Sequence, residues 1–217
     1  MKKLAVLISG RGSNLSALIA ACADTAFPAE ITIVIANRPG AAGLALAKKA
    51  GIATLVIDHK KYDDRAAFDA ALDTVLRREN VDLVCLAGFM RLLTDGFVNG
   101  WRGKMINIHP SLLPAFKGRD VHQRALDAGV TLSGCTVHYV TPEMDSGPIV
   151  AQAAVPVVPG DTAEALADRI LAAEHVLYPH AVRLICEGRA SFDGPEAGQA
   201  HEKGTDTKCP PLISPPL

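Results

Sequence analysis

The stretch KLAVLISGRGSNL, residues 3–15, decides the fold class of this chain. Its first half is a continuous aliphatic run, and its second half is a polar loop that contains Gly10 and Gly12. An apolar run without alternation predicts a strand buried on both faces, as in parallel sheets covered by helices. The loop leads into a segment with helical periodicity, residues 13–23. We therefore expect a strand, a tight loop and a helix at the start of an α/β fold.

More aliphatic runs follow, and they alternate with helical patterns. The runs are residues 31–36, 53–57, 81–87 and 104–108, and the helical patterns are residues 41–50 and 63–79. This alternation predicts right-handed crossovers and a Rossmann-like doubly wound sheet. After residue 130 two long strands, 131–140 and 148–158, flank the loop TPEMDSGP, and a helix runs from 161 to about 187. We predict an α/β fold with a mostly parallel N-terminal half and an antiparallel C-terminal portion.

Composition restricts the function classes. The chain has 217 residues, a formal charge of -1, 49% hydrophobic and 21% charged residues, which predicts a globular protein and favours neither nucleic acid nor membrane as a partner. The five cysteines are scattered and form no C-x-x-C pair, which favours a reduced, cytoplasmic protein without a zinc module. We expect residues 1–193 to form one domain and residues 194–217, rich in Gly, Pro, Glu, Lys and Thr, to be a disordered tail.

The glycine loop after the first strand predicts an anion site. Gly12 allows close backbone approach, and Ser13 and Asn14 are residues that favour a helix N-terminus. Backbone N–H groups and the helix dipole at such a turn bind anions. The carboxyl ends of parallel strands are also where ligands bind in open sheets. A phosphate monoester is the ligand that this pattern favours.

Two other interpretations of the loop stay open. A dinucleotide fingerprint would need glycine where Leu15 stands, and the second strand ends in Ala36-Asn37-Arg38 without the acidic residue that holds a ribose diol. Arg38 could still meet a 2′-phosphate, which leaves NADP open. The loop could also be a tight turn before a helix, without any ligand.

A second polar feature is the stretch MINIHPSLLP, residues 105–114. Asn107 and His109 share one face of the strand, and polar side chains on a core strand cost free energy unless they are satisfied. A catalytic imidazole needs an orienting partner, and Asp145 in the TPEMDSGP loop is the best candidate. An amide donor and a charged imidazole aimed at one carbonyl oxygen suit stabilisation of a tetrahedral oxyanion.

Other roles for these residues are weaker but remain open. Asn107 and His109 could simply pair with loop backbone. Metal ligation by His109, Asp145, His122 or His138 lacks tight ligand spacing, so we expect no metal. We interpret His138 as a satisfied core histidine.

The combination of ISGRGSNL, AGFMRLL, INIHPSLLP, a Thr-Val-His strand and MDSGP resembles the phosphoribosylglycinamide formyltransferase family of de novo purine biosynthesis. The resemblance covers about residues 3–190. It implies transfer of a formyl group from the cosubstrate 10-formyltetrahydrofolate to the amine of glycinamide ribonucleotide. It also implies small-molecule substrates, no nucleic acid or membrane partner, and a monomer or homodimer.

The resemblance also assigns roles to individual residues. Asn107 would bind the formyl oxygen, His109 would be the cationic donor and general acid, and Asp145 would keep His109 charged and relay protons. The loop residues Gly12, Ser13 and Asn14 would bind the phosphate, and Glu174 would contact the ribose. A solvated helical carboxylate is the alternative for Glu174.

The folate side is implied by three further segments. Residues matched to folate-binding positions of the family are Arg65, Met90, Arg91, Leu92, Leu93, Asn107, Thr141, Glu143 and Asp145. The loop containing Met90 follows the fourth expected strand, and its alternative is an ordinary apolar loop. Arg65 could instead be a charge on a helix surface.

Two related enzyme families and one other class are rivals. Methionyl-tRNA formyltransferase would need a C-terminal RNA-binding domain with a basic surface, which we do not expect here. Formyltetrahydrofolate deformylase would need an N-terminal regulatory domain, and we expect the chain to start at its first strand. A nucleotide-binding sensor without catalysis would leave Asn107, His109 and Asp145 unexplained.

Overall fold

The computed structural model describes residues 1–193. The tail expected at residues 194–217 lies outside the described residues. The sheet is built from strands β1 (Lys2–Ile8), β2 (Ala29–Ala36), β3 (Ala53–Val56), β4 (Leu83–Leu86), β5 (Met105–His109), β6 (Leu132–Tyr139) and β7 (Ile149–Pro156). The helices are α1 (Ser13–Cys22), α2 (Gly43–Lys49), α3 (Arg65–Arg78), α4 (Asp95–Gly100), α5 (Val121–Asp127) and α6 (Ala163–Cys186), with a 3-10 turn η1 (His59–Lys61). Every strand expected from the sequence is confirmed within a few residues.

The sheet has the strand order β3-β2-β1-β4-β5-β6-β7. Strands β1 to β5 pair in parallel, and β6 pairs antiparallel with both β5 and β7. The strand order reverses direction between β1 and β4, which makes this the point where open α/β sheets bind ligands. The predicted α/β class, parallel in the N-terminal half and antiparallel in the C-terminal portion, is confirmed.

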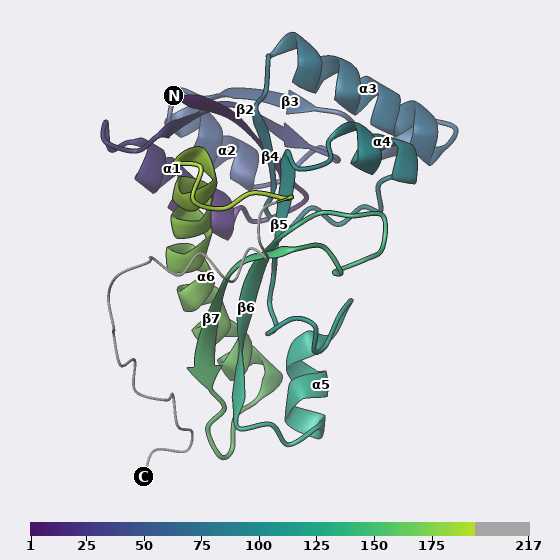
Figure 1. Ribbon diagram of the computed structural model, residues 1–217. Helices are drawn as coiled ribbons and strands as arrows, with labels where there is room; N and C mark the ends of the chain where they lie inside the picture. The colour runs from purple at the N-terminus through teal and green to yellow at the C-terminus, as the bar shows by residue number, and fades with distance from the viewer. Residues whose placement is uncertain (194–217) are drawn as a thin grey trace.

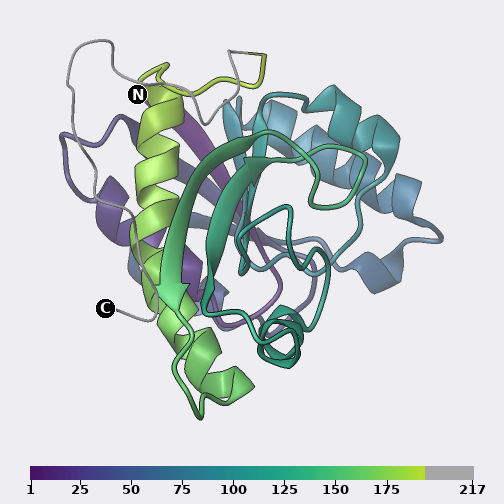
Figure 2. The same ribbon diagram turned by 60° about the horizontal axis from the view of Figure 1, so that its bottom comes forward.

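Helices cover both faces of the sheet, as Figure 1 shows: α1, α2 and α6 lie on one side, and α3 and α4 lie on the other. The same division is visible after rotation (Figure 2). Each side has its own hydrophobic cluster, one built around Leu15, Leu18 and Tyr178 and the other around Phe68 and Leu72. Since β1, β2 and β4 contribute side chains to both clusters, these strands are largely apolar on both faces, which explains the continuous aliphatic runs.

Glycines allow α1 and α2 to begin side by side. Gly12 has a left-handed φ of 79°, and a Cβ atom there would lie 2.7 Å from the Cα of Gly43. The N–H of Gly43 donates to the carbonyl of Gly10 at 3.0 Å. Only a residue without a side chain fits at position 12. The glycine loop therefore packs directly against the start of α2.

Two further observations concern the described residues alone. None of the helices in residues 1–193 is both long enough and apolar enough to span a membrane. Within the same range, Cys22, Cys85, Cys135 and Cys186 are free thiols. The prediction of a cytoplasmic protein stays a prediction.

Candidate active site

Four polar side chains meet on one face of strands β5 and β6. In the antiparallel register Asn107 lies opposite His138, and His109 lies opposite Thr136. Directly opposed residues of neighbouring strands project to the same face. His109, Thr136 and His138 are buried, and Asn107 is half-buried. The sequence predicted the proximity of Asn107 and His109, but the two partners on β6 follow from the strand register.

Both ring nitrogens of His109 face an acceptor. Nε2 lies 3.0 Å from the carbonyl oxygen of Phe116, so it carries a hydrogen that it donates to that oxygen. Nδ1 lies 3.5 Å from Oδ2 of Asp145, whose side chain is 10% exposed. The ring therefore has a hydrogen-bond acceptor beside each of its two nitrogens. The expected convergence of His109 and Asp145 is present in the structure.

Asp145 reaches this face because the loop between β6 and β7 folds back over β5. The residue has a left-handed φ of 51°, and its Oδ2 accepts a hydrogen bond from the backbone N–H of Gly118 at 2.8 Å. Its Oδ1 lies 3.6 Å from Nε2 of His138. Asp145 is thus placed between the two histidines, and one oxygen is also held by the loop that follows β5.

Hydrogen bonds and an ion pair join the loop after β5 to the loop after β6. Beside the bond from Gly118 to Asp145, the Nζ of Lys117 donates to the hydroxyl of Ser146 and lies 3.7 Å from Oε1 of Glu143. Glu143 is otherwise exposed, and the hydroxyl of Thr141 donates to the backbone carbonyl of Glu143 at 3.1 Å. Together the loops cover His109. They form one wall of the polar cluster, which consists of Asn107, His109, Thr136, His138 and Asp145.

Thr136 fixes the start of the loop after β5. Its hydroxyl donates to the carbonyl of Ser111 at 2.7 Å and accepts from the N–H of Leu113 at 3.0 Å. Gln152 on β7 adds a bond from Nε2 to the same hydroxyl at 2.9 Å. Since buried backbone groups must find partners, this threonine determines where the chain turns away from His109. Thr136 is the threonine of the Thr-Val-His motif, to which the sequence alone assigned no role.

The second part of the candidate site is the glycine loop, which leads directly into α1. Gly12 is the N-cap residue of α1, and no side chain among residues 1–193 caps this helix. Ser13 and Asn14 are the first two helical residues, so they lie at the helix N-terminus as expected, while Gly12 occupies the capping position. The free N–H groups of the first turn remain available to an anion, as the phosphate interpretation requires.

A hydrogen bond joins Asn14 on α1 to Glu174 on the neighbouring helix α6. The Nδ2 of Asn14 donates to Oε2 of Glu174 at 2.7 Å, and both side chains are buried. Burial raises the pKa of the Glu174 carboxyl, while the bond from Asn14 lowers it. Oδ1 of Asn14 is buried without a hydrogen-bond partner. The solvated carboxylate considered for Glu174 is therefore excluded.

The loop after β4 lies beside the glycine loop. The backbone N–H of Met90 donates to the hydroxyl of Ser9 at 2.7 Å. Met90 and Leu92 are among the most exposed large apolar side chains, at 77% and 63%. Leu93 instead packs against the core, and the guanidinium of Arg91 lies 5.9 Å from the ring centre of Phe68. Exposed apolar side chains next to the glycine loop form a surface suited to a flat organic ligand.

Among the described residues, the remaining candidates make no hydrogen bond or ion pair with Asn107, His109, His138 or Asp145. Arg65 is exposed at the first residue of α3. Arg38 is also exposed, and its Nε donates to the backbone carbonyl of Ser9, so it lies over the glycine loop. His122 is half-buried on α5, and burial followed by the charge of His109 lowers its pKa.

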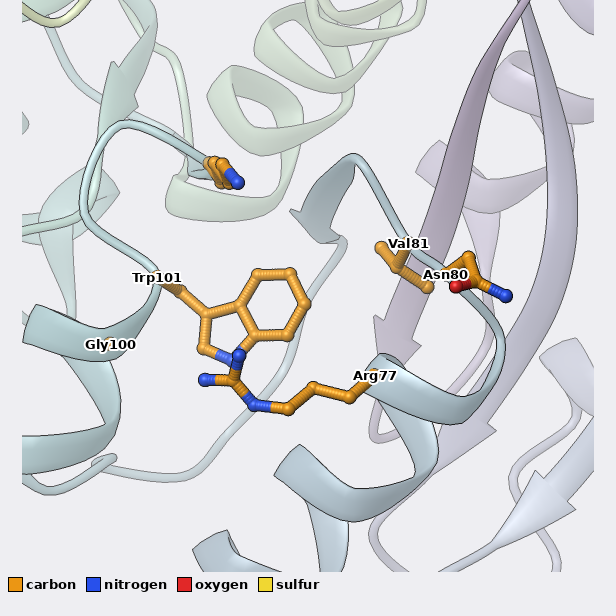
Figure 3. Close-up of a pocket in the computed structure, with 6 residues that line it drawn as sticks. Arg77, Asn80, Val81, Gly100 and Trp101 are labelled. Atoms are coloured by element: carbon orange, nitrogen blue, oxygen red, sulfur yellow. The ribbon is translucent and has the colours of Figure 1, made fainter.

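A separate hollow of about 270 Å³ is shown in Figure 3. It lies before β4 and β5, at the amino ends of these strands, whereas the glycine loop follows the carboxyl end of β1. Its lining includes Trp101 and Arg77, but Arg77 is paired with Asp73 at 2.7 Å. Because no histidine among residues 1–193 lines this hollow, we do not place the candidate site there.

Within residues 1–193, no group of three or more His, Cys, Asp or Glu side chains has an arrangement that could hold a metal ion. The absence of a metal from the reaction stays a prediction.

The chain is similar in sequence and in fold to several known proteins. A family model described as "Formyl transferase" matches residues 2–182. Phosphoribosylglycinamide formyltransferase of Haemophilus influenzae is 42% identical over 212 residues, covering 93% of this chain and 100% of the relative. The crystal structure of glycinamide ribonucleotide transformylase 1 from Symbiobacterium toebii has a TM-score of 0.87 and 49% identity, covering 89% of this chain and 92% of that one.

A longer relative is more similar in sequence. The trifunctional purine biosynthetic protein adenosine-3 of Bos taurus is 55% identical over 186 residues, which cover 86% of this chain but 18% of the relative. The chain thus spans about a fifth of the length of these trifunctional relatives. With a family model over most of its length and relatives well above 30% identity, the chain belongs to the formyl transferase family.

Proposed function

We propose that this chain is a phosphoribosylglycinamide formyltransferase, which moves a formyl group from 10-formyltetrahydrofolate to the amine of glycinamide ribonucleotide in purine (IMP) biosynthesis. The observation that carries the proposal is the meeting of Asn107, His109 and Asp145 on one face, with an uncapped helix N-terminus at the glycine loop of the same sheet. The printed names of the relatives supply the substrate class. Residues 1–193 would form the catalytic domain.

The glycine loop would hold the sugar phosphate of the acceptor. Backbone N–H groups of Ser13 and Asn14 are free at the start of α1 and carry the positive end of the helix dipole. Glu174, next to Asn14, would accept hydrogen bonds from ribose hydroxyls. A phosphate anchored here would leave the amine at the other end of the acceptor free to reach the polar cluster.

The folate would lie against the loop after β4. Met90 and Leu92 would cover the apolar faces of its pterin, and backbone groups of Arg91, Leu92 and Leu93 would bind its polar edge. Thr141, Glu143 and Asp145 would close this pocket from the loop after β6, and Arg65 would meet the glutamate end of the cosubstrate. No metal is needed for this arrangement.

The reaction would then proceed through a tetrahedral intermediate. The unprotonated amine nitrogen attacks the formyl carbon, and a new C–N bond forms while the formyl oxygen becomes an oxyanion. The amide N–H of Asn107 and the charged ring of His109 stabilise this oxygen. The bond to N10 of the folate breaks, the attacking nitrogen loses one proton, and N10 gains one through His109, Asp145 and water. The products are the formylated acceptor and tetrahydrofolate.

One contact has to change before His109 can take part. Its Nε2–H donates to the carbonyl of Phe116, so the formyl oxygen must take the place of that carbonyl. The loop after β5 would therefore shift when the substrates bind. The acceptor amine must be neutral and His109 charged, so we expect a bell-shaped pH–rate profile.

The test is incubation of the full chain with 10-formyltetrahydrofolate, with and without glycinamide ribonucleotide. Formation of tetrahydrofolate and formylated acceptor only when the acceptor is present supports the proposal. Release of formate without the acceptor would instead identify a deformylase. No reaction with the acceptor, from folded protein, would overturn the proposal.

A further inference from the structure

His138 is the one histidine of the polar cluster to which the mechanism above gives no role. It lies on β6 directly opposite Asn107, and it is 2% exposed. A polar ring buried in this way requires hydrogen-bond partners for both nitrogens. Its two contacts determine which nitrogen carries the hydrogen.

The tautomer of His138 follows from its backbone partner. Nδ1 lies 2.9 Å from the carbonyl oxygen of Tyr139, and a carbonyl oxygen can only accept, so Nδ1 carries the hydrogen. Burial lowers the pKa of His138, with the charge of His109 acting in the same direction, while the bond to Tyr139 and the nearby Asp145 raise it. The ring is therefore neutral, and Nε2 has a free lone pair.

That lone pair orients Asn107. The Nδ2 of Asn107 lies 3.3 Å from Nε2 of His138, and only the amide nitrogen can donate to a lone pair. Turning the amide around would place its oxygen against the same lone pair, which is repulsive. One N–H of Asn107 is thus used by His138, and its second N–H is left to face a substrate.

The neutral state of His138 also matters for Asp145, because Asp145 lies beside both histidines. Its Oδ1 lies 3.6 Å from Nε2 of His138, and its Oδ2 lies 3.5 Å from Nδ1 of His109. A proton on Nε2 of His138 would turn that ring into a competing cation and would remove the acceptor from Asn107. A single carboxylate between two imidazoles serves His109 only while His138 stays uncharged.

We propose that His138 is a positioning residue for formyl transfer: as a neutral ring it directs the amide N–H of Asn107 toward the reacting carbonyl and leaves Asp145 to His109. This inference rests on the proposed function. His138 touches neither substrate nor the reacting atoms, so its effect passes through Asn107 and Asp145.

The first test needs no substrate. In the full chain labelled with ¹⁵N-histidine, NMR near neutral pH should show His138 with a hydrogen on Nδ1 and a bare Nε2. A doubly protonated ring, or one with its hydrogen on Nε2, would overturn the proposal whether or not the chain transfers formyl groups.

The second test compares two substitutions at position 138. His138→Leu removes the acceptor, and we expect kcat to fall about 100-fold, the usual loss when one oxyanion donor is misplaced. Both KM values should change by less than about threefold, because only transition-state stabilisation is affected. His138→Gln can present its carbonyl oxygen to Asn107 and should recover kcat to within about 10-fold of the unsubstituted chain.

The control is His180→Gln, at an exposed histidine on α6, which should leave kcat unchanged. A merely structural role would lower stability in both position-138 variants without rescue of kcat by Gln. A normal kcat in His138→Leu, or equal losses in Leu and Gln, would overturn the proposal; if His138→Leu does not fold, the Gln variant and the NMR result decide it. Failure of the unsubstituted chain to transfer formyl groups would instead count against the proposed function.

Discussion

The glycine loop and the polar cluster on β5 and β6 are parts of one proposed site that are built in different ways. The loop is local in sequence: its N–H groups come from residues that follow one strand and begin one helix. The cluster gathers side chains from β5, β6 and the loop after β6. Backbone groups in a tight turn supply a fixed partial charge, whereas side chains brought together by strand pairing can exchange protons. The first part suits binding and the second suits chemistry.

This comparison predicts that binding and turnover can be separated by mutation. The largest effect is expected for His109→Ala and Asp145→Ala. Each should lower kcat by about 10²–10⁴-fold, the usual contribution of a positioned acid or base. Affinity for glycinamide ribonucleotide, measured by calorimetry, should change little, because the phosphate would be held by the glycine loop.

His180→Ala on the exposed side of α6 is the matched control and should behave like the unsubstituted chain. A near-normal kcat for either cluster variant would contradict the assigned roles. Equal losses in affinity and turnover would remove the distinction between the two regions.

The second-largest effect is expected for a substitution in the glycine loop. Gly12→Ala combines a φ of 79° with a Cβ only 2.7 Å from the Cα of Gly43, whereas Gly40→Ala has a φ of 76° and nothing within 4 Å. Both substitutions force a left-handed residue, at about 1–2 kcal/mol. Gly12→Ala should lose a further 1–3 kcal/mol or so in urea unfolding through overpacking, and it should raise KM for glycinamide ribonucleotide.

The difference between these two variants isolates the close contact from the backbone strain that they share. Similar losses of stability at both positions would show that α1 and α2 can move apart. An unchanged KM in a folded Gly12→Ala variant would place the phosphate elsewhere.

The smallest effect is expected at Glu174, which joins the loop to α6. Because its pKa is raised by burial, the folded chain binds this proton more tightly than the unfolded chain does, so stability is lost as pH rises above the ordinary value of 4.5. Glu174→Gln removes the charge and keeps an acceptor for Asn14. The variant should be more stable than the unsubstituted chain at pH 7, and this advantage should shrink below pH 4.5.

Thermal unfolding at both pH values measures this difference, with Glu30→Gln at an exposed position of β2 as the control. The same Glu174 variant should bind glycinamide ribonucleotide less tightly if the carboxylate meets the ribose. A pH-independent difference in stability would mean that folding does not shift the pKa of Glu174.

The sequence by itself determined the parallel half of the sheet and the glycine loop. Both are local: continuous aliphatic runs predict strands buried on two faces, and Gly12 is followed at once by the helix it begins. Asn107 and His109 were predictable as a pair for the same reason, since residues two apart on a strand share a face.

Only the tertiary structure decided the partners of that pair. His138 lies opposite Asn107 because of the antiparallel register between β5 and β6, and a shift by one residue would have turned it to the other face. The side chain of Asp145 reaches His109 because the loop after β6 folds back over β5. Glu174 is buried against Asn14 because α6 packs beside α1. Such contacts depend on packing between distant segments, which local sequence patterns do not specify.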